Sequence, residues 1–366
     1  MSKKEAIDSL SELETIKIRK KDGIDIPLKR GAQAKTSSTY LEHVRLVHNA
    51  LPELDYADIE TSCFFMNRRF SAPLIIDSMT GGTPEARKIN ERLGKLAQEH
   101  NIPMGLGSQR AGLKSEELAS TYAVARKNAP QGFLIANIGG AQLSKGLTIN
   151  EVKKIIEMIQ ADAIVIHLNP LQELIQPEGE PKYSGVLHQI TELVTNLDLP
   201  VMVKEVGAGI SREVAVKLEK AGIAAINIAG SGGTSWAGVE KMRADAAKNK
   251  IKIHLGKLFW DWGIPTAVSL MEVKSVVKKT PIVASGGLRN GLEVAKCVAL
   301  GADMCAMAYP FLVAAARSTD SLFNYMNMVL AELKSTMFLL GSKNIEMLKS
   351  SRYILTGALA VEVNPA

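Results

Sequence analysis

The stretch IVASGGLRNG at residues 282–291 and the stretch GADMCAMAY at residues 301–309 decide the fold class. Each contains a short apolar run, and the first run ends in Ser-Gly-Gly shortly before Asn290, a residue type that can cap a helix. Apolar runs that are continuous rather than alternating are typical of parallel strands buried on both faces. The two stretches therefore predict neighbouring βα units with polar groups at the carboxyl end of the first strand.

The same rhythm of apolar runs and amphipathic segments extends upstream to residue 73. The predicted strands are Pro73–Asp77, Pro103–Leu106, Phe133–Asn137, Ala163–His167, Val201–Glu205, Ala225–Ile228, Ile282–Ser285 and Met304–Met307. The predicted helices, with Ser211 and Asn290 as candidate N-caps, include Pro84–His100, Asn150–Ile159, Ser211–Ala221 and Asn290–Leu300. Eight βα units in roughly 240 residues predict an α/β protein built on one (β/α)8 TIM barrel rather than two smaller domains.

Two flanking segments complete the predicted organisation of the 366-residue chain. Residues 1–72 are expected to form an N-terminal extension that covers the barrel mouth, and residues 73–366 the barrel with a C-terminal helical block. That block is expected from about Ser318, and a core-facing stripe at helical spacing is formed by Met326, Leu330, Leu333 and Met337.

Composition excludes several classes of protein. With 46% hydrophobic and 22% charged residues, the chain is neither disordered nor fibrous. A net charge of +6 favours anionic ligands, but the basic N-terminal segment lacks interleaved aromatic residues, so no nucleic-acid surface is expected. The absence of a signal-peptide core and of any run of about 18 apolar residues predicts a cytoplasmic protein without membrane association. Three cysteines without ligand spacing predict neither disulfides nor a zinc site.

Polar residues follow the predicted strands on one side of the barrel. Because the carboxyl ends of barrel strands build the active site, these loops are the candidate site. Gly, Ser and Asn are common in turns, which could explain each loop by itself. It does not explain why all the polar loops lie at the same end of the barrel. After the first six strands the loops read SMTGG at 78–82, GSQR at 107–110, NIGG at 137–140, HLNPLQE at 167–173, KEVG at 204–207 and GSGGT at 230–234.

The glycines after the seventh strand indicate a phosphate site. In barrels, the loops after strands seven and eight commonly bind phosphate, since glycine lets backbone N–H groups approach the oxygens, and Arg289 can add a charge. Lys204 ends an apolar strand and must face the solvated mouth or pair with an anion. Two partners remain open for it, an electron-rich cofactor ring and a neighbouring carboxylate such as Glu205.

The fourth loop offers His167, Asn169, Gln172 and Glu173 within seven residues. One carboxylate is too few for a metal cage made by protein alone, but it suits Mg²⁺ shared with a phosphorylated substrate. A single histidine at a strand end is more often a structural residue than a catalyst.

Taken together, the motifs resemble those of the type 2 isopentenyl diphosphate isomerases from about Arg19 to Lys343. The motifs are RK, SMTGG, GSQR, ANIG, HLNPLQE, QPEGEP, KEVG, GSGGT, DWGIPTA and SGGLRNG. The resemblance implies an FMN-dependent barrel isomerase of isoprenoid biosynthesis, which interconverts isopentenyl diphosphate and dimethylallyl diphosphate by a 1,3-allylic shift. It further implies reduced FMN and Mg²⁺ as cofactors, NADPH as the expected reductant and a homo-oligomer.

The resemblance also implies roles for particular residues. The catalytic residues would be Gln172, His167 and Lys204, with Lys204 beside the N1/O2 side of the flavin, Gln172 facing the isoprenoid part and Glu173 binding Mg²⁺. The substrate diphosphate would contact Arg19, Lys20, Ser108, Gln109 and Arg110. FMN would contact Met79, Thr80, Gly81, Ser108, Asn137, Lys204, Thr234, Gly287, Leu288, Arg289, Ala308 and Tyr309.

Two departures and two alternatives accompany the resemblance. Gly23 stands where the family usually has histidine, and Ala229 stands where many members have Ser or Thr; each change could cost about 1 kcal/mol of affinity. An FMN-dependent 2-hydroxy-acid oxidoreductase would need a histidine base and an arginine clamp late in the barrel, where strands six to seven offer only His254. A non-enzymatic flavin- or RNA-binding protein would have no need for Glu173 beside Arg110.

Overall fold

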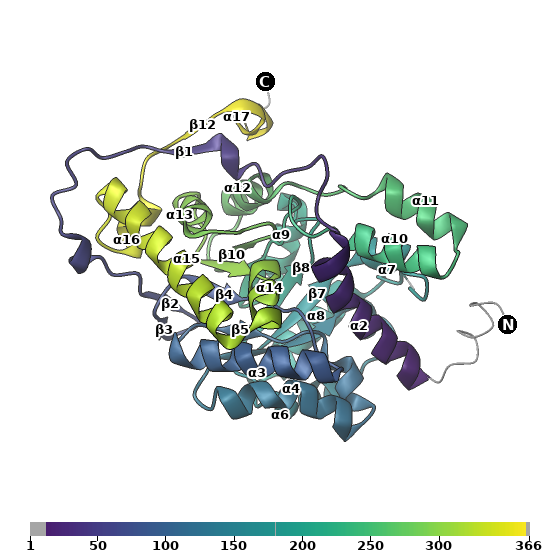
Figure 1. The fold of residues 1–366 in the computed structure, drawn as a ribbon. Coiled ribbons are helices and arrows are strands. Elements are labelled where there is room, and N and C mark those ends of the chain that lie inside the picture. The colour runs from purple at the N-terminus through teal and green to yellow at the C-terminus, as the bar shows by residue number, and fades with distance from the viewer. Residues whose placement is uncertain (1–11, 180, 364–366) are drawn as a thin grey trace.

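A closed barrel of eight parallel strands forms the centre of the computed structural model, which describes residues 12–179 and 181–363 (Figure 1). The order around the barrel is β10-β11-β4-β5-β6-β7-β8-β9, so β11 closes it against β4. All eight predicted strands are confirmed. Their bounds are β4 (Leu74–Ile76), β5 (Met104–Gly105), β6 (Leu134–Gly139), β7 (Ala163–Leu168), β8 (Val201–Glu205), β9 (Ala225–Asn227), β10 (Ile282–Ser285) and β11 (Met304–Met307).

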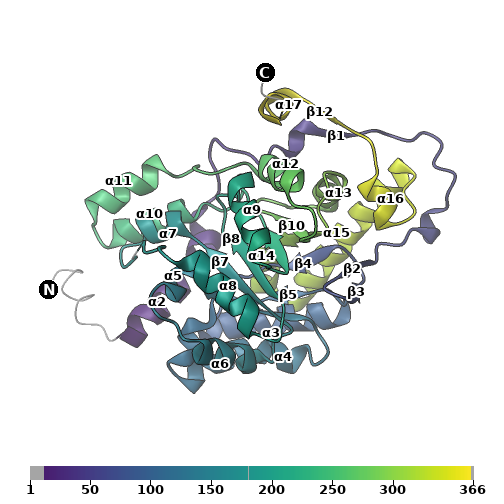
Figure 2. The same cartoon turned by 180° about the vertical axis from the view of Figure 1, so that it is seen from behind.

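Helices surround the barrel, as expected for parallel strands buried on both faces (Figure 2). The predicted N-caps are confirmed, because Ser211 accepts a hydrogen bond from Val214 N and Asn290 accepts one from Glu293 N. The helices that follow β4 to β10 are α3 (Pro84–Glu99), α4 (Glu116–Asn128), α5 (Gly140–Leu143), α6 (Ile149–Ile159), α7 (Pro170–Ile175), α8 (Val186–Asn196), α9 (Arg212–Lys220), α10 (Trp236–Ala246), α11 (Lys250–Leu258), α12 (Thr266–Val276) and α13 (Gly291–Ala299). The short turns η1 (Leu41–His43) and η2 (Tyr56–Asp58) precede β4, and η3 (Gln109–Leu113) lies between β5 and α4.

The C-terminal block packs on the outside of the barrel. It consists of α14 (Tyr309–Arg317), α15 (Thr319–Leu340), α16 (Ile345–Lys349), β12 (Tyr353–Leu355) and α17 (Gly357–Val363). Ser318 caps α15, and Met326, Leu333 and Met337 of the predicted stripe are fully buried. The fourth member, Leu330, is partly buried and packs against the same core. β12 pairs with β1 (Val44–Leu46) and so joins the end of the chain to its N-terminal part.

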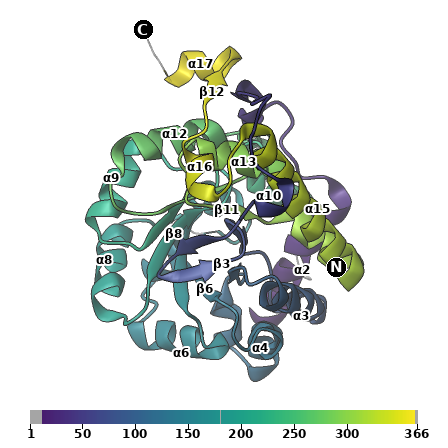
Figure 3. The same ribbon diagram turned by 90° about the vertical axis from the view of Figure 1, so that its left-hand side faces the viewer.

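A hairpin closes the amino end of the barrel. Strands β2 (Cys63–Phe65) and β3 (Arg68–Phe70) pair antiparallel and lie across that end in Figure 3. Phe65 and Phe70 are buried against the lower interior side chains, including Phe133 and Met202. The ligand cavity is therefore confined to the opposite, carboxyl end.

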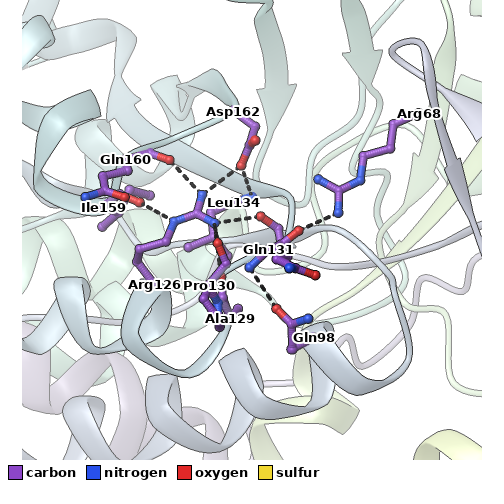
Figure 4. A network of polar contacts seen from close by, with 11 residues as sticks. Arg68, Gln98, Arg126, Ala129, Pro130, Gln131, Leu134, Ile159, Gln160 and Asp162 are labelled. Carbon is purple, nitrogen blue, oxygen red and sulfur yellow. Dashed lines mark hydrogen bonds and ion pairs between the residues drawn. The ribbon is translucent and has the colours of Figure 1, made fainter.

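Arg126, in the last turn of α4, ties together the loops before β6 and β7 (Figure 4). Its guanidinium donates hydrogen bonds to carbonyl oxygens of Ala129 (3.0 Å) and Ile159 (3.0 Å) and lies 2.8 Å from the Asp162 carboxylate. Asp162 also accepts from Leu134 N, so this network fixes the amino ends of two neighbouring strands.

The N-terminal segment begins with α2 (Glu12–Arg30), a helix that the sequence analysis did not identify, and α2 lies beside α10 (Figure 1). The first eleven residues of the predicted extension, and Glu180 of the QPEGEP motif, are outside the described residues. Within the described ranges, no helix has both the length and the apolar character needed to cross a bilayer.

Candidate active site

A cavity of about 230 Å³ opens at the carboxyl end of the barrel. Side chains from α2 and from the ends of the strands line it together, so residues far apart in the chain meet in one site. The predicted site residues in its lining are Arg19, Lys20, Met79, Thr80, Ser108, Arg110, Asn137, His167, Gln172, Glu173, Lys204, Thr234, Gly287, Leu288, Arg289, Ala308 and Tyr309.

The structure does not bring Gln109 or Gly81 into the lining. Gln109 is fully buried, and its amide donates to Ile155 O (3.0 Å) while its oxygen accepts from Asn137 N (3.1 Å). The side chain is therefore used to position β6 rather than to meet a diphosphate. A Cβ at Gly81 would lie 1.8 Å from the Tyr122 ring, so glycine is required there for close packing.

Three cations from two elements line one end of the cavity. Arg19 and Lys20 come from α2, and Arg110 comes from the turn after β5. Lys20 Nζ donates to Ser108 O at 2.7 Å, and Tyr122 Oη donates to the same oxygen at 2.9 Å. Burial, Arg19 and Arg110 lower the pKa of Lys20 to about 7. This crowding of positive charge is the electrostatics expected of a site for a multiply charged anion.

Lys204 forms an ion pair with Asp77, with Nζ and Oδ2 3.0 Å apart. Glu205, which the sequence left open as one of two kinds of partner for Lys204, points elsewhere and accepts from the backbone N–H groups of Val206 and Gly207, each at 2.6 Å. Burial raises the pKa of Glu205 to about 7. The carboxylate that pairs with Lys204 is therefore Asp77, at the end of β4.

His167 is held as a neutral imidazole. Its Nδ1 lies 2.8 Å from Asn137 Oδ1, and because Asn137 Nδ2 donates to Leu106 O, that oxygen accepts the Nδ1 proton of the histidine. Burial, followed by the charges of Lys204 and Lys20, lowers the pKa of His167 to about 3. At neutral pH the ring is therefore uncharged: Nδ1 donates a hydrogen bond to Asn137, and Nε2 can accept one.

Gln172 belongs to a network that the sequence analysis missed. Its Nε2 donates to Glu240 Oε1 at 2.9 Å, and Glu240 is paired with Arg243 at 2.7 Å. Arg243 also pairs with Asp22 of α2 at 3.3 Å and with Glu178 at 2.7 Å. A carboxylate and an arginine three residues apart on a helix, just after GSGGT, were the available signal.

Glu173 is buried at the start of α7, where Asn169 Nδ2 lies 3.5 Å from its Oε1. Among the described residues, no three His, Cys, Asp or Glu side chains are clustered as a metal site. A divalent cation at Glu173 would therefore take its remaining ligands from substrate, water or amide oxygens.

The double-glycine turn after β10 forms the other end of the cavity. Gly286 and Gly287 have φ values of 98° and 80°, and a Cβ at Gly287 would lie 2.4 Å from Thr39 Cγ2. The side chain of Arg289 packs over the Tyr309 ring at 5.1 Å and donates to Gln33 Oε1 at 2.7 Å. Gln33 was not predicted as a site residue.

Comparison with known proteins shows which family the chain belongs to. The sequence profile of the FMN-dependent dehydrogenase family matches residues 167–355. An isopentenyl-diphosphate delta-isomerase of a Nostoc species is 45% identical over 91% of this chain and 94% of its own length. The Archaeoglobus fulgidus protein of the same name is 44% identical over 93% of this chain and 96% of its own.

Solved structures with the same fold have diverged much further in sequence. A mandelate oxidase variant superposes with a TM-score of 0.62 at 18% identity, covering 94% of this chain and 99% of that one. A protein described as a lactate oxidase of Pediococcus acidilactici gives 0.64 at 16% identity, covering 95% and 96%. These two establish the barrel fold alone. The identities of 44–45% over nearly the whole chain establish more, and the chain belongs to the isopentenyl-diphosphate delta-isomerase family.

Proposed function

We propose that this protein interconverts isopentenyl diphosphate and dimethylallyl diphosphate with bound FMN and Mg²⁺, in isoprenoid biosynthesis. The observation that supports this most is that one cavity is lined both by the cations Arg19, Lys20 and Arg110 and by the Gly287–Arg289 turn. A phosphorylated cofactor and a diphosphate substrate would each have a site. The names of the family relatives supply the reaction.

The residues present fit FMN. Gly287 and Gly233 leave room for backbone N–H groups to face a phosphate, because a Cβ at Gly233 would come within 2.5 Å of Gly287 N. Reduced FMN, when bound, supplies ring nitrogens that exchange protons and a negative π system that stabilises a cation-like state. The residues that would hold it are Met79, Thr80, Ser108, Asn137, Lys204, Thr234, Gly287, Leu288, Arg289, Ala308 and Tyr309.

The diphosphate would be anchored away from the reacting carbons. Arg19, Lys20 and Arg110 would contact its oxygens, and Glu173 would share Mg²⁺ with it. Binding energy obtained there positions the alkene, as expected when a remote group orients a small substrate. Since α2 carries Arg19 and Lys20, anchoring the diphosphate would also keep α2 over the cavity and water out.

Gln172 and His167 would act at the isoprenoid end. Glu240 accepts from the Gln172 amide, which fixes the direction of that side chain, and burial raises the pKa of Glu240. His167, neutral and hydrogen-bonded to Asn137, would orient polar groups without adding charge.

Cavity residues give no support to the 2-hydroxy-acid oxidoreductase alternative. In the described part of the chain, the single histidine that lines the cavity is His167, whereas His254 is exposed on α11. A cytoplasmic location, a homo-oligomer, NADPH as reductant and a covering role for residues 1–72 stay predictions.

Product analysis tests the proposal. The purified protein is loaded with FMN, reduced anaerobically and incubated with Mg²⁺ and isopentenyl diphosphate. Dimethylallyl diphosphate is the expected product. If none forms while lactate bleaches the oxidised flavin, the oxidoreductase alternative replaces the proposal.

A further inference from the structure

We infer that Asp77 sets how much positive charge Lys204 presents to the bound flavin ring. This inference rests on the proposed function, because that proposal places FMN beside Lys204. Asp77 is absent from the predicted site, yet it lines the same cavity.

The ion pair spans the interior of the barrel. Lys204 lies on β8 and Asp77 directly follows β4, and these strands stand on opposite sides of the eight-stranded ring. The ammonium and carboxylate are 3.0 Å apart, and their side chains are only 7% and 10% exposed. The Lys204 side chain therefore crosses the cavity floor to reach its partner, so both charges lie beneath whatever the cavity binds.

Hydrogen bonds hold the carboxylate in place. Asp77 Oδ1 accepts from Ser78 N at 2.8 Å, and the backbone N of Asp77 donates to Met307 O at 3.0 Å. The second oxygen is thereby aimed at Lys204. A carboxylate fixed by its own backbone contacts keeps its distance from the ammonium without help from a ligand.

The other titratable groups near Lys204 do not replace Asp77. His167, which pairs with Lys204 in the β7–β8 register, is neutral. Glu205 directs its carboxylate to Val206 N and Gly207 N on the following loop. Asp77 is thus the anion that touches the Lys204 ammonium in the described structure.

An anion this close changes what a ligand experiences. A bound ring meets a dipole rather than a full positive charge, because the field of the ammonium is largely cancelled at a distance. A less positive surrounding leaves ring nitrogens more basic and makes a negative ring less stable. A neutralised Lys204–Asp77 pair would therefore favour proton exchange at the ring nitrogens more than it would favour electron uptake by the ring.

Sulfite affinity of the FMN-loaded protein measures this charge. Sulfite adds to N5 of the oxidised ring and places a negative charge on the ring, so positive charge nearby tightens binding. Asp77→Asn keeps the shape of the side chain and one oxygen that can accept from Ser78 N, but it replaces the acceptor that faces Lys204 with an NH2 donor and removes the anion; we expect the sulfite Kd to fall about tenfold. The two-electron midpoint potential should rise by a matching amount, about 30 mV.

Two variants make the measurement specific. Asp77→Glu keeps the charge and should leave the sulfite Kd within about threefold of the parent value. Asp303→Asn removes a carboxylate that pairs with Lys349 (3.1 Å) at the amino end of β11, and should leave sulfite affinity within about twofold.

The outcomes separate this inference from the proposed function. An unchanged sulfite Kd in FMN-loaded Asp77→Asn would overturn the inference and leave the proposed function standing. Loss of FMN from Asp77→Asn would give Asp77 a purely structural role and would also overturn it. A parent protein that binds no FMN would overturn both.

Discussion

The guanidinium of Arg289 donates a hydrogen bond to the side-chain oxygen of Gln33 across 2.7 Å. The amide nitrogen of Gln33 donates in turn to Thr234 Oγ1 at 3.2 Å, and the next residue, Ala34, donates its N–H to Gly233 O at 2.7 Å. Gln33 therefore joins two residues proposed to contact FMN. It lies three positions after α2, so the helix that carries Arg19 and Lys20 is tied to the phosphate end of the cavity.

Gln33→Ala should weaken FMN binding about tenfold, because a hydrogen bond to a charged group contributes about 1.5–3 kcal/mol. The affinity for riboflavin, which lacks the phosphate, should fall by less than about threefold. Fluorescence titration of the flavin-free protein measures both. Thr36→Val is the matched control, since Thr36 bonds Asp261 at 2.7 Å farther along the same segment. Equal losses for FMN and riboflavin would contradict a role at the phosphate end.

Lys20 should make diphosphate binding depend on pH. Its pKa in the free protein is lowered to about 7, and a bound diphosphate favours the charged form, so binding takes up a proton above that pH. Affinity for isopentenyl diphosphate should be greatest below pH 7 and fall as pH rises, by at most about tenfold per unit.

Calorimetric titration between pH 6 and 9 checks this dependence. Lys20→Arg keeps its charge throughout and should flatten the curve, and any titration of the ligand itself is common to both proteins. The same slope in both proteins would rule Lys20 out as its source.

Glu173→Gln should reduce turnover by at least about 100-fold, because the amide no longer offers Mg²⁺ an anionic oxygen. The flavin should stay bound, and excess Mg²⁺ should recover part of the activity. Product formation against Mg²⁺ concentration, with the flavin absorbance recorded, measures both effects. Glu157→Gln removes an exposed carboxylate on α6 and should leave the Mg²⁺ dependence unchanged. Loss of flavin instead would show that Glu173 belongs to the cofactor site.

The barrel was predictable because its signals are local. Each strand is a short apolar run, and the caps Ser211 and Asn290 are followed directly by their helices. Loop chemistry also marked the rim, since polar residues follow one strand after another at the same end. Most residues that line the cavity directly follow a barrel strand, so each can be identified from its own position in the sequence.

Contacts between distant residues were not predictable. Gln33 and Arg289 are 256 positions apart, and Lys204 and Asp77 are 127 apart. Sequence proximity left Glu205 as one of two candidate partners for Lys204, but the Glu205 carboxylate binds backbone N–H groups of the loop that follows it. The family resemblance placed Gln109 at the diphosphate, yet η3 directs its side chain into the core, which only the path of the backbone decides.

Arg126→Ala should lower the free energy of unfolding by about 3 kcal/mol or more. It would leave several loop carbonyls and the Asp162 carboxylate without their partner (Figure 4). Arg126→Lys should recover only part of the loss, because one ammonium cannot reach both loops. Urea unfolding measures the change, and Arg87→Ala, which loses one exposed contact to Ser120, is the control. A loss below about 1 kcal/mol would show that water replaces these contacts.

Gly23→His should improve substrate binding, since the space for a side chain already exists. Gly23 lines the cavity from α2, and a Cβ there would meet only Trp236 Cη2, at 4.0 Å. Glycine inside a helix costs about 1 kcal/mol relative to alanine, so Gly23→Ala separates the stabilisation of α2 from the effect of the imidazole. The KM of Gly23→His for isopentenyl diphosphate should be about threefold lower than that of Gly23→Ala at pH 6, where the imidazole is charged, and the difference should be smaller at pH 8. If the two variants have the same KM at pH 6, the imidazole does not reach the diphosphate, and the glycine matters only for the stability of the helix.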